Sequence, residues 1–107
     1  MSLDISFIDP TATYDNSLSD FNITHNLIRM ARVSGVYDAL WGGHGMRAKD
    51  IIQILKNGIA ELERNPEHYK TFNAVNGWGT YDDFLPWIKE VLCAAETYPE
   101  SIIEVWS

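Results

Sequence analysis

Apolar and polar residues alternate in two short segments, one at each end of the chain. Residues 3–7 (LDISF) form the first segment and are followed by Asp9 and Pro10, and residues 101–106 (SIIEVW) form the second. Alternation with a period of two predicts a half-buried strand. Two strands alone are marginally stable in water. We therefore expect the terminal strands to pair as a small two-stranded sheet with helices over one face.

Between the terminal segments, the apolar residues have helical spacing. From Asn22 onward they recur at i, i+4, i+7 and i+8, which predicts an amphipathic helix with Asn22 as its N-cap and Gly35 just beyond its end. Residues 36–41 predict a short second helix. Residues 48–62 carry the strongest apolar stripe and predict a long helix, despite the low helix propensity of Gly58.

The segments beside these helices carry turn and break signals. Residues 11–20 are polar and rich in turn residues, which predicts a loop. Asn65 and Pro66 predict the end of the long helix and the start of another, with Asn65 as N-cap and Pro66 at the first helical position. We expect Tyr69 and Phe72 on the inner face of this next helix.

The start of the last helix depends on a proline. Thr80 is a good N-cap by residue type, but a helix beginning there would hold Pro86 in its interior, where the missing N–H removes a hydrogen bond. A start at Asp82 or Asp83 places Pro86 in the first turn, where that N–H has no intrahelical partner. We therefore expect the later start, which leaves NGWGTY (residues 76–81) as an ordered loop.

Together these patterns predict one fold class. We expect an α+β protein, mostly α, with about four to five helices and a small two-stranded sheet joining the termini. No repeat, linker or low-complexity tract divides the sequence, so residues 1–107 are expected to form a single domain. A hydrophobic fraction of 46% is enough for one core.

Charge and cysteine content narrow the class of function. The net charge is −7, and residues 61–107 hold nine acidic residues against three basic ones, so non-specific nucleic-acid binding is not expected. No apolar run is long enough for a membrane span, and the N-terminus has no secretory signal, so we expect a soluble cytoplasmic protein. Cys93 is the single cysteine and is predicted to be a buried, inert thiol. No metal site or cofactor is expected.

Three motifs occur in a recognisable order: NITHNL at residues 22–27, VYDALW at residues 36–41 and NGWGTY at residues 76–81. They resemble motifs of small proteins encoded by tailed bacteriophages and prophages, whose members carry NITHN or NYTHN, a YxALW/Y segment, an AKD-type helix start and NGWGxY. The resemblance spans nearly the whole chain. Some relatives carry an N-terminal zinc ribbon with paired cysteines that this sequence lacks, so no zinc site is implied. The resemblance implies a phage or prophage setting in the bacterial cytoplasm, and no mechanism.

The first and third motifs are the candidate binding site. Polar residues of NITHN are poor helix formers, so they need a structural or functional reason. One interpretation is structural: the Asn26 amide satisfies backbone groups of another segment, and Trp78 closes over the Asn-His helix, leaving a part-open edge. The other is a pocket in which polar groups orient a ligand beside an aromatic wall. The candidate residues are Asn22, His25, Asn26, Trp41, Asn76, Trp78 and Tyr81.

A second, weaker candidate is the glycine-rich segment before the long helix. Gly43 and Gly45 precede Arg47 and Lys49 at the expected helix start. Helix N-terminal amides bind anions, so these four residues are an anion-site hypothesis. The segment is not a Walker A phosphate-binding loop, which needs a GK[ST] ending. The alternative is a flexible connector, which the resemblance favours because the related proteins vary in this loop.

We weigh three functions on this basis. The first is a non-enzymatic accessory protein that binds a host or phage protein through the acidic C-terminal half and the aromatic loop. The alternative is a protein that binds or sequesters a small nucleotide-like ligand. The third is an enzyme with His25 as general base, although no nucleophile constellation accompanies it.

Overall fold

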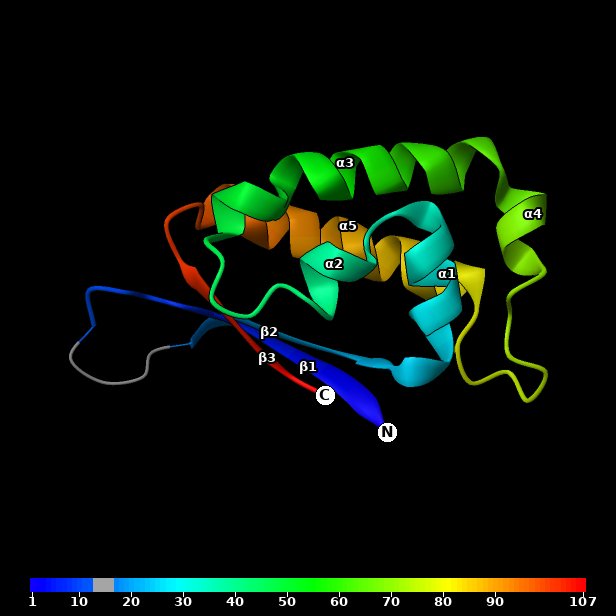
Figure 1. The fold of residues 1–107 in the computed structure, drawn as a ribbon, viewed down its shortest axis with the longest axis horizontal. Helices are drawn as coiled ribbons and strands as arrows, with labels where there is room; N and C mark the ends of the chain where they lie inside the picture. The colour runs from blue at the N-terminus through cyan, green and yellow to red at the C-terminus, as the bar shows by residue number, and fades with distance from the viewer. Residues whose placement is uncertain (13–16) are drawn as a thin grey trace.

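The computed structural model describes residues 1–12 and 17–107. Its elements are β1 (Ser2–Ile8), β2 (Ser17–Thr24), the 3₁₀ turn η1 (His25–Leu27), α1 (Ile28–Ser34), α2 (Tyr37–Leu40), α3 (Ala48–Arg64), α4 (Pro66–Lys70), α5 (Tyr81–Thr97) and β3 (Ile102–Trp106) (Figure 1). The described residues thus form an α+β fold with five α-helices, as expected. The sheet differs from the expectation.

The sheet has three antiparallel strands in the order β2-β1-β3, so the expected pair of terminal strands is only part of it. The additional strand, β2, occupies residues that we predicted as the end of a loop and the start of a helix. Residues 13–16 of that predicted loop lie outside the described residues. Asn22 is consequently a strand residue paired with Asp4, and its prediction as a helix N-cap is wrong.

All helices of the described residues lie on one side of the sheet, and no described helix or strand covers the other side, which we call the uncovered face (Figure 1). Leu3, Ile5 and Phe7 point toward the helices and are fully buried, whereas Asp4 between them is exposed. This alternation is the period-two pattern of the sequence realised as a half-buried strand. The core therefore lies between the inner face of the sheet and the helices, where α3 packs along α5.

α2 and α3 confirm the predicted helices, whereas α1 begins at Ile28 rather than directly after Asn22. α1 ends at Gly35, whose φ of 90° is left-handed and allows its N–H to reach the carbonyls of Ala31 and Arg32. Gly58 is buried within α3, and a Cβ atom there would lie 2.1 Å from Cγ1 of Val36. Gly58 is therefore required by the packing of α3 against the chain between α1 and α2.

The ends of α4 and α5 correct two expectations. Pro66 begins α4 as predicted, but the Asn65 side chain makes no capping hydrogen bond and instead donates to Glu61. α5 begins at Tyr81 with Thr80 as N-cap, whose side chain accepts from the Asp83 N–H at 3.3 Å. The predicted start at Asp82 or Asp83 is thus wrong, and Pro86 lies inside the helix. Pro86 removes one hydrogen bond near the exposed first turn, and the Thr80 cap offsets part of that loss.

Candidate functional site

Residues 73–80, which lie between α4 and α5, form a loop fixed by hydrogen bonds. We call these residues the Trp78 loop. Within it, the Ala74 N–H donates to the Gly79 carbonyl at 2.9 Å, and the Gly77 N–H donates to the Ala74 carbonyl at 3.0 Å. The Asn76 side chain accepts from the Trp78 N–H at 3.0 Å. Such an Asx turn is a favoured role for asparagine. The prediction of an ordered loop is confirmed for residues 76–80, whereas Tyr81 is the first residue of α5.

Two glycines give the Trp78 loop its shape. Gly77 and Gly79 have φ values of 79° and 116°, in the region that only glycine occupies readily. Gly79 is buried, and a Cβ atom there would lie 3.0 Å from Thr24 and 3.1 Å from Asn26. The backbone at Gly79 therefore packs directly on the NITHN segment, which leaves no room for a side chain.

One hydrogen bond joins the two motifs. Nδ2 of Asn26 donates to the main-chain carbonyl of Trp78 at 2.7 Å. Thr24 caps η1 by accepting from the Asn26 N–H at 3.2 Å, which places Asn26 for this contact. The Asn26 amide satisfies the backbone of a distant segment, as the structural interpretation predicted.

Trp78 itself points away from the core. Its exposed fraction is 73%, and Val75 in the same loop is fully exposed. The expectation that Trp78 closes over the Asn-His helix is therefore wrong: the hydrogen bonds hold the backbone of the loop, and the side chain extends into solvent. Sequence reasoning also missed Val75, because the short apolar pair Ala74-Val75 between two asparagines carries no periodic signal.

Tyr81 belongs to the core rather than to the surface of the loop. Only 7% of it is exposed, and its hydroxyl donates to the Leu62 carbonyl at 2.8 Å. Its N–H donates to the Asn73 side chain at 2.7 Å. Tyr81 anchors the end of the Trp78 loop to α3, and its ring cannot form the wall of an open pocket.

His25 and Trp41 form a separate aromatic cluster. Their ring centroids are 6.2 Å apart, and Trp41 stacks on Tyr37 at 5.6 Å with the rings almost parallel. The guanidinium of Arg32 covers the other part of this stack, 4.3 Å from the Tyr37 ring centroid. Nε2 of His25 and Nε1 of Trp41 are buried and have no hydrogen-bond partner among the described residues. The cluster extends along α1 and α2 and does not include Trp78.

Asn22 lies on the uncovered face of the sheet. Its Nδ2 donates to Oδ1 of Asp4 at 2.7 Å and to Oγ of Ser2 at 3.0 Å. On the same face, the Asp20 carboxylate accepts hydrogen bonds from the hydroxyls of Ser17 and Ser6. These bonds lower the pKa of the Asp20 carboxyl group. Of the seven candidate residues, only Asn22 lines one of four surface depressions of about 310–470 Å³. The structure does not bring the seven residues into one concavity.

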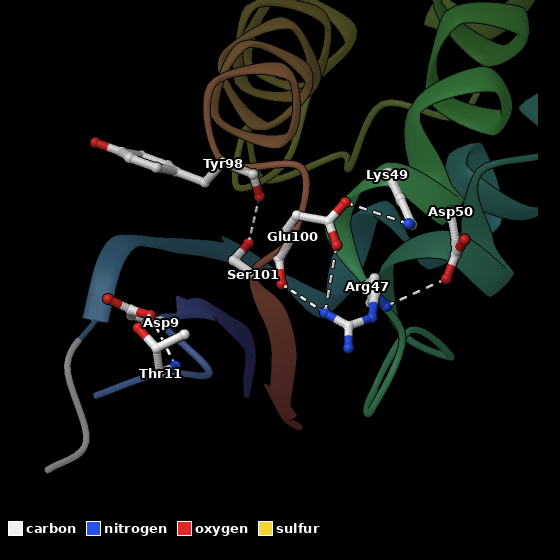
Figure 2. A network of polar contacts seen from close by, with 8 residues as sticks. All are labelled: Asp9, Thr11, Arg47, Lys49, Asp50, Tyr98, Glu100 and Ser101. Atoms are coloured by element: carbon white, nitrogen blue, oxygen red, sulfur yellow. Dashed lines mark hydrogen bonds and ion pairs between the residues drawn. The ribbon is translucent and has the colours of Figure 1, made fainter. Parts of the chain in front are cut away.

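The geometry of the glycine-rich segment does not support an anion site. The N–H groups of Ala48 and Lys49, which open α3, donate to the carbonyls of Ser101 and Pro99 at 2.9 Å each. Both predicted bases contact Glu100: Arg47 Nη1 lies 3.6 Å and Lys49 Nζ 3.2 Å from its carboxylate (Figure 2). The amides and bases that an anion would need are thus already engaged within the chain.

The same segment has a structural role at the edge of the sheet. The Gly45 N–H donates to the Ile103 carbonyl, and the Ile103 N–H donates to the Met46 carbonyl, both at 2.8 Å. Nδ1 of His44 accepts from the Val105 N–H at 3.0 Å. The segment before α3 therefore covers the outer edge of β3, and a flexible connector is also the wrong description of it.

The described residues hold neither a candidate metal site nor a helix that could span a membrane. Over residues 1–12 and 17–107, no group of three or more His, Cys, Asp or Glu side chains is placed to hold a metal ion. In the same residues, no helix has the length and apolar character needed to cross a membrane. No protein-family model, curated protein sequence or solved structure matches the chain.

Proposed function

We propose that this chain is an accessory protein of a phage or prophage that acts by binding another protein, and that the Trp78 loop is its anchor. The phage setting rests on the resemblance of the motifs NITHN and NGWGTY. The observation that carries the binding role is an indole that is 73% exposed on a loop with a fixed backbone.

The fixed backbone matters because binding normally restricts the residues that make contact. A loop already held by hydrogen bonds loses little further conformational entropy when a partner binds, so more of the contact energy appears as affinity. Tryptophan is enriched among the few interface residues that carry most of the binding energy. Trp78, with the fully exposed Val75 in the same loop, offers an apolar anchor that is presented before any partner arrives.

The charges around the anchor indicate the kind of partner. Asp82 and Asp83 follow the Trp78 loop at the start of α5, and both are exposed. The C-terminal part of the chain, residues 61–107, is strongly acidic. We therefore expect a partner surface with an apolar pocket for Trp78 and basic residues around it, because complementary charge steers association and excludes wrong partners.

The test is affinity capture with matched variants. Tagged wild-type chain, Trp78→Ala, Trp78→Phe and Trp106→Ala are incubated with lysate of a bacterial host, and retained proteins are quantified by mass spectrometry. Trp106 is the control because it is also an exposed tryptophan, at 55%, on a different element. We expect one protein to be retained by the wild type and Trp106→Ala, lost with Trp78→Ala and partly recovered with Trp78→Phe.

Two outcomes would contradict the proposal. The first is that all four chains retain the same proteins, which would exclude the Trp78 loop as the anchor. The second is that the wild type retains nothing above an untagged control, which would argue against a protein-binding role in that host.

A further inference from the structure

The free edge of the sheet is the backbone of β2. The His25 N–H donates to the Met1 carbonyl at 3.3 Å, so the pairs that exchange hydrogen bonds between β1 and β2 involve the odd-numbered residues. Hydrogen-bonded and non-hydrogen-bonded pairs alternate in an antiparallel ladder. The N–H and C=O groups of Asp20 and Asn22 therefore point away from β1, and among the described residues nothing pairs with them.

The two edge strands, β2 and β3, differ in whether another segment pairs with their outer side. The outward N–H and C=O of Ile103 and the N–H of Val105, all on β3, are paired with the segment before α3. No residue in the ranges 1–12 and 17–107 covers β2 in this way, and its sequence SLSDFNIT contains neither the lysine nor the proline that commonly protects edge strands. An uncovered edge of this kind is a template for the addition of a further strand.

A groove runs between this edge and α5. It has a volume of about 360 Å³, and its lining includes Phe21 from β2, Glu90 and Ala94 from α5, and Tyr98 just after α5. Side chains of an added strand would alternate between this groove and the uncovered face of the sheet, because successive residues of a strand point to opposite faces. The groove is lined mostly by apolar groups and suits apolar side chains.

The acidic residues near the edge indicate which residues the added strand carries outside the groove. Glu90 lies at the groove, Asp20 lies on the uncovered face, and no lysine or arginine lines the groove. A second copy of this chain, with a net charge of −7, would bring like charges together. We propose that β2 receives an extended segment of a partner protein, in which apolar residues enter the groove and alternate with basic residues on the uncovered face.

Cys93 provides a local probe of this site. It is the only cysteine of the chain, it lines the groove, and it is exposed, contrary to the sequence prediction of a buried thiol. Its rate of alkylation by iodoacetamide therefore measures how much of the groove is covered. Hydrogen exchange of the Asp20 and Asn22 amides measures pairing of the edge.

The experiment uses the purified chain and three capped peptides. TKVKVKT has the proposed pattern, TKPKPKT has the same charge but cannot pair as a strand, and TEVEVET has the opposite charge. We expect TKVKVKT to slow alkylation of Cys93 by about tenfold when its concentration is about ten times the Kd. It should also slow exchange of the Asp20 and Asn22 amides, whereas the other two peptides should change neither rate.

Variants of the chain separate edge pairing from loss of fold. Asn22→Pro removes the outward N–H, and Asn22→Ala loses the same side-chain hydrogen bonds but keeps that N–H, so only the first should lose protection. Asp20→Asn removes a charge from the uncovered face, where the lysines of TKVKVKT would lie, and should weaken binding of TKVKVKT by about fivefold through loss of an exposed charge contact.

Three results would overturn the inference. No peptide protects Cys93 at millimolar concentration, or TEVEVET protects it as well as TKVKVKT. Alternatively, Cys93 of the chain alone becomes protected as its own concentration rises, which would make a second copy the occupant. None of these results depends on Trp78, so failure here is distinguishable from failure of the proposed function.

Discussion

Asn26 and Trp78 are joined by a hydrogen bond of 2.7 Å between the Asn26 side chain and the Trp78 carbonyl. The bond connects the two motifs that mark the sequence, NITHN and NGWGTY. It fixes the backbone of Trp78 and leaves the indole in solvent. Asn26 is therefore a structural residue that holds the backbone from which Trp78 extends into solvent. A structural role for NITHN and a binding role for NGWGTY are thus compatible.

Loss of this bond should loosen the loop. We expect Asn26→Ala to lower the free energy of unfolding by about 0.5–1.5 kcal/mol, the usual net contribution of one hydrogen bond. Amide exchange in residues 73–80 should rise more than exchange elsewhere, as measured by mass spectrometry. Unchanged exchange in those residues would show that Asn26 does not hold the loop.

The two glycines of the loop should differ in their tolerance of alanine. Gly77→Ala requires a left-handed alanine but meets open space, so we expect a loss of about 1 kcal/mol. Gly79→Ala adds close contacts with Thr24 and Asn26, and we expect a loss of about 2 kcal/mol or more. Urea unfolding of both variants measures the difference, and equal losses would contradict the described packing.

Gly58→Ala should destabilise the protein, although alanine is the better helix former. The added methyl group would overlap Cγ1 of Val36, and overpacking of this kind costs about 1–3 kcal/mol. The matched test is the double variant Gly58→Ala with Val36→Ala, in which the methyl group has room. We expect a smaller loss in the double variant than the sum of the single losses, and simple additivity would argue against the contact.

Acid should weaken the outer face of the sheet. The hydroxyls of Ser17 and Ser6 lower the pKa of Asp20 below its ordinary value of 3.8. A carboxyl group with a lowered pKa in the folded state contributes stability above its unfolded pKa and loses it as the pH falls through its folded pKa. Asparagine does not titrate, so we expect Asp20→Asn to lose less stability than the wild type as the pH falls below about 4. Identical acid unfolding curves for the two proteins would contradict this.

Much of the fold follows from local pattern, and the exceptions have physical causes. The stripe in residues 48–62 has one periodicity and confirmed the helix it predicted. Ile23 and Leu27 also have helical spacing, but one lies in β2 and the other in η1, because pairing with β1 outweighs local preference. Thr80 caps α5 although Pro86 then lies inside the helix, and residue types alone do not reveal how the gain from the cap compares with the lost hydrogen bond.

The candidate site was predictable only in part. Residue types correctly linked Asn26 to the backbone of another segment, since an asparagine that is not a cap needs a partner. The direction of Trp78 was not predictable, because it depends on two left-handed glycines and on contact with the NITHN segment. The free edge of β2 could not be predicted, because residues 17–24 were expected to be loop and helix rather than a strand.

The most direct test of the central claim is the affinity of a captured partner for matched tryptophan variants. Calorimetry with the purified partner should show that Trp78→Ala weakens binding by about 2 kcal/mol or more, which is about thirtyfold in Kd. Trp106→Ala should change Kd by less than about threefold, and both variants should keep wild-type stability, since both side chains are exposed. Equal affinity of Trp78→Ala and the wild type would contradict the account.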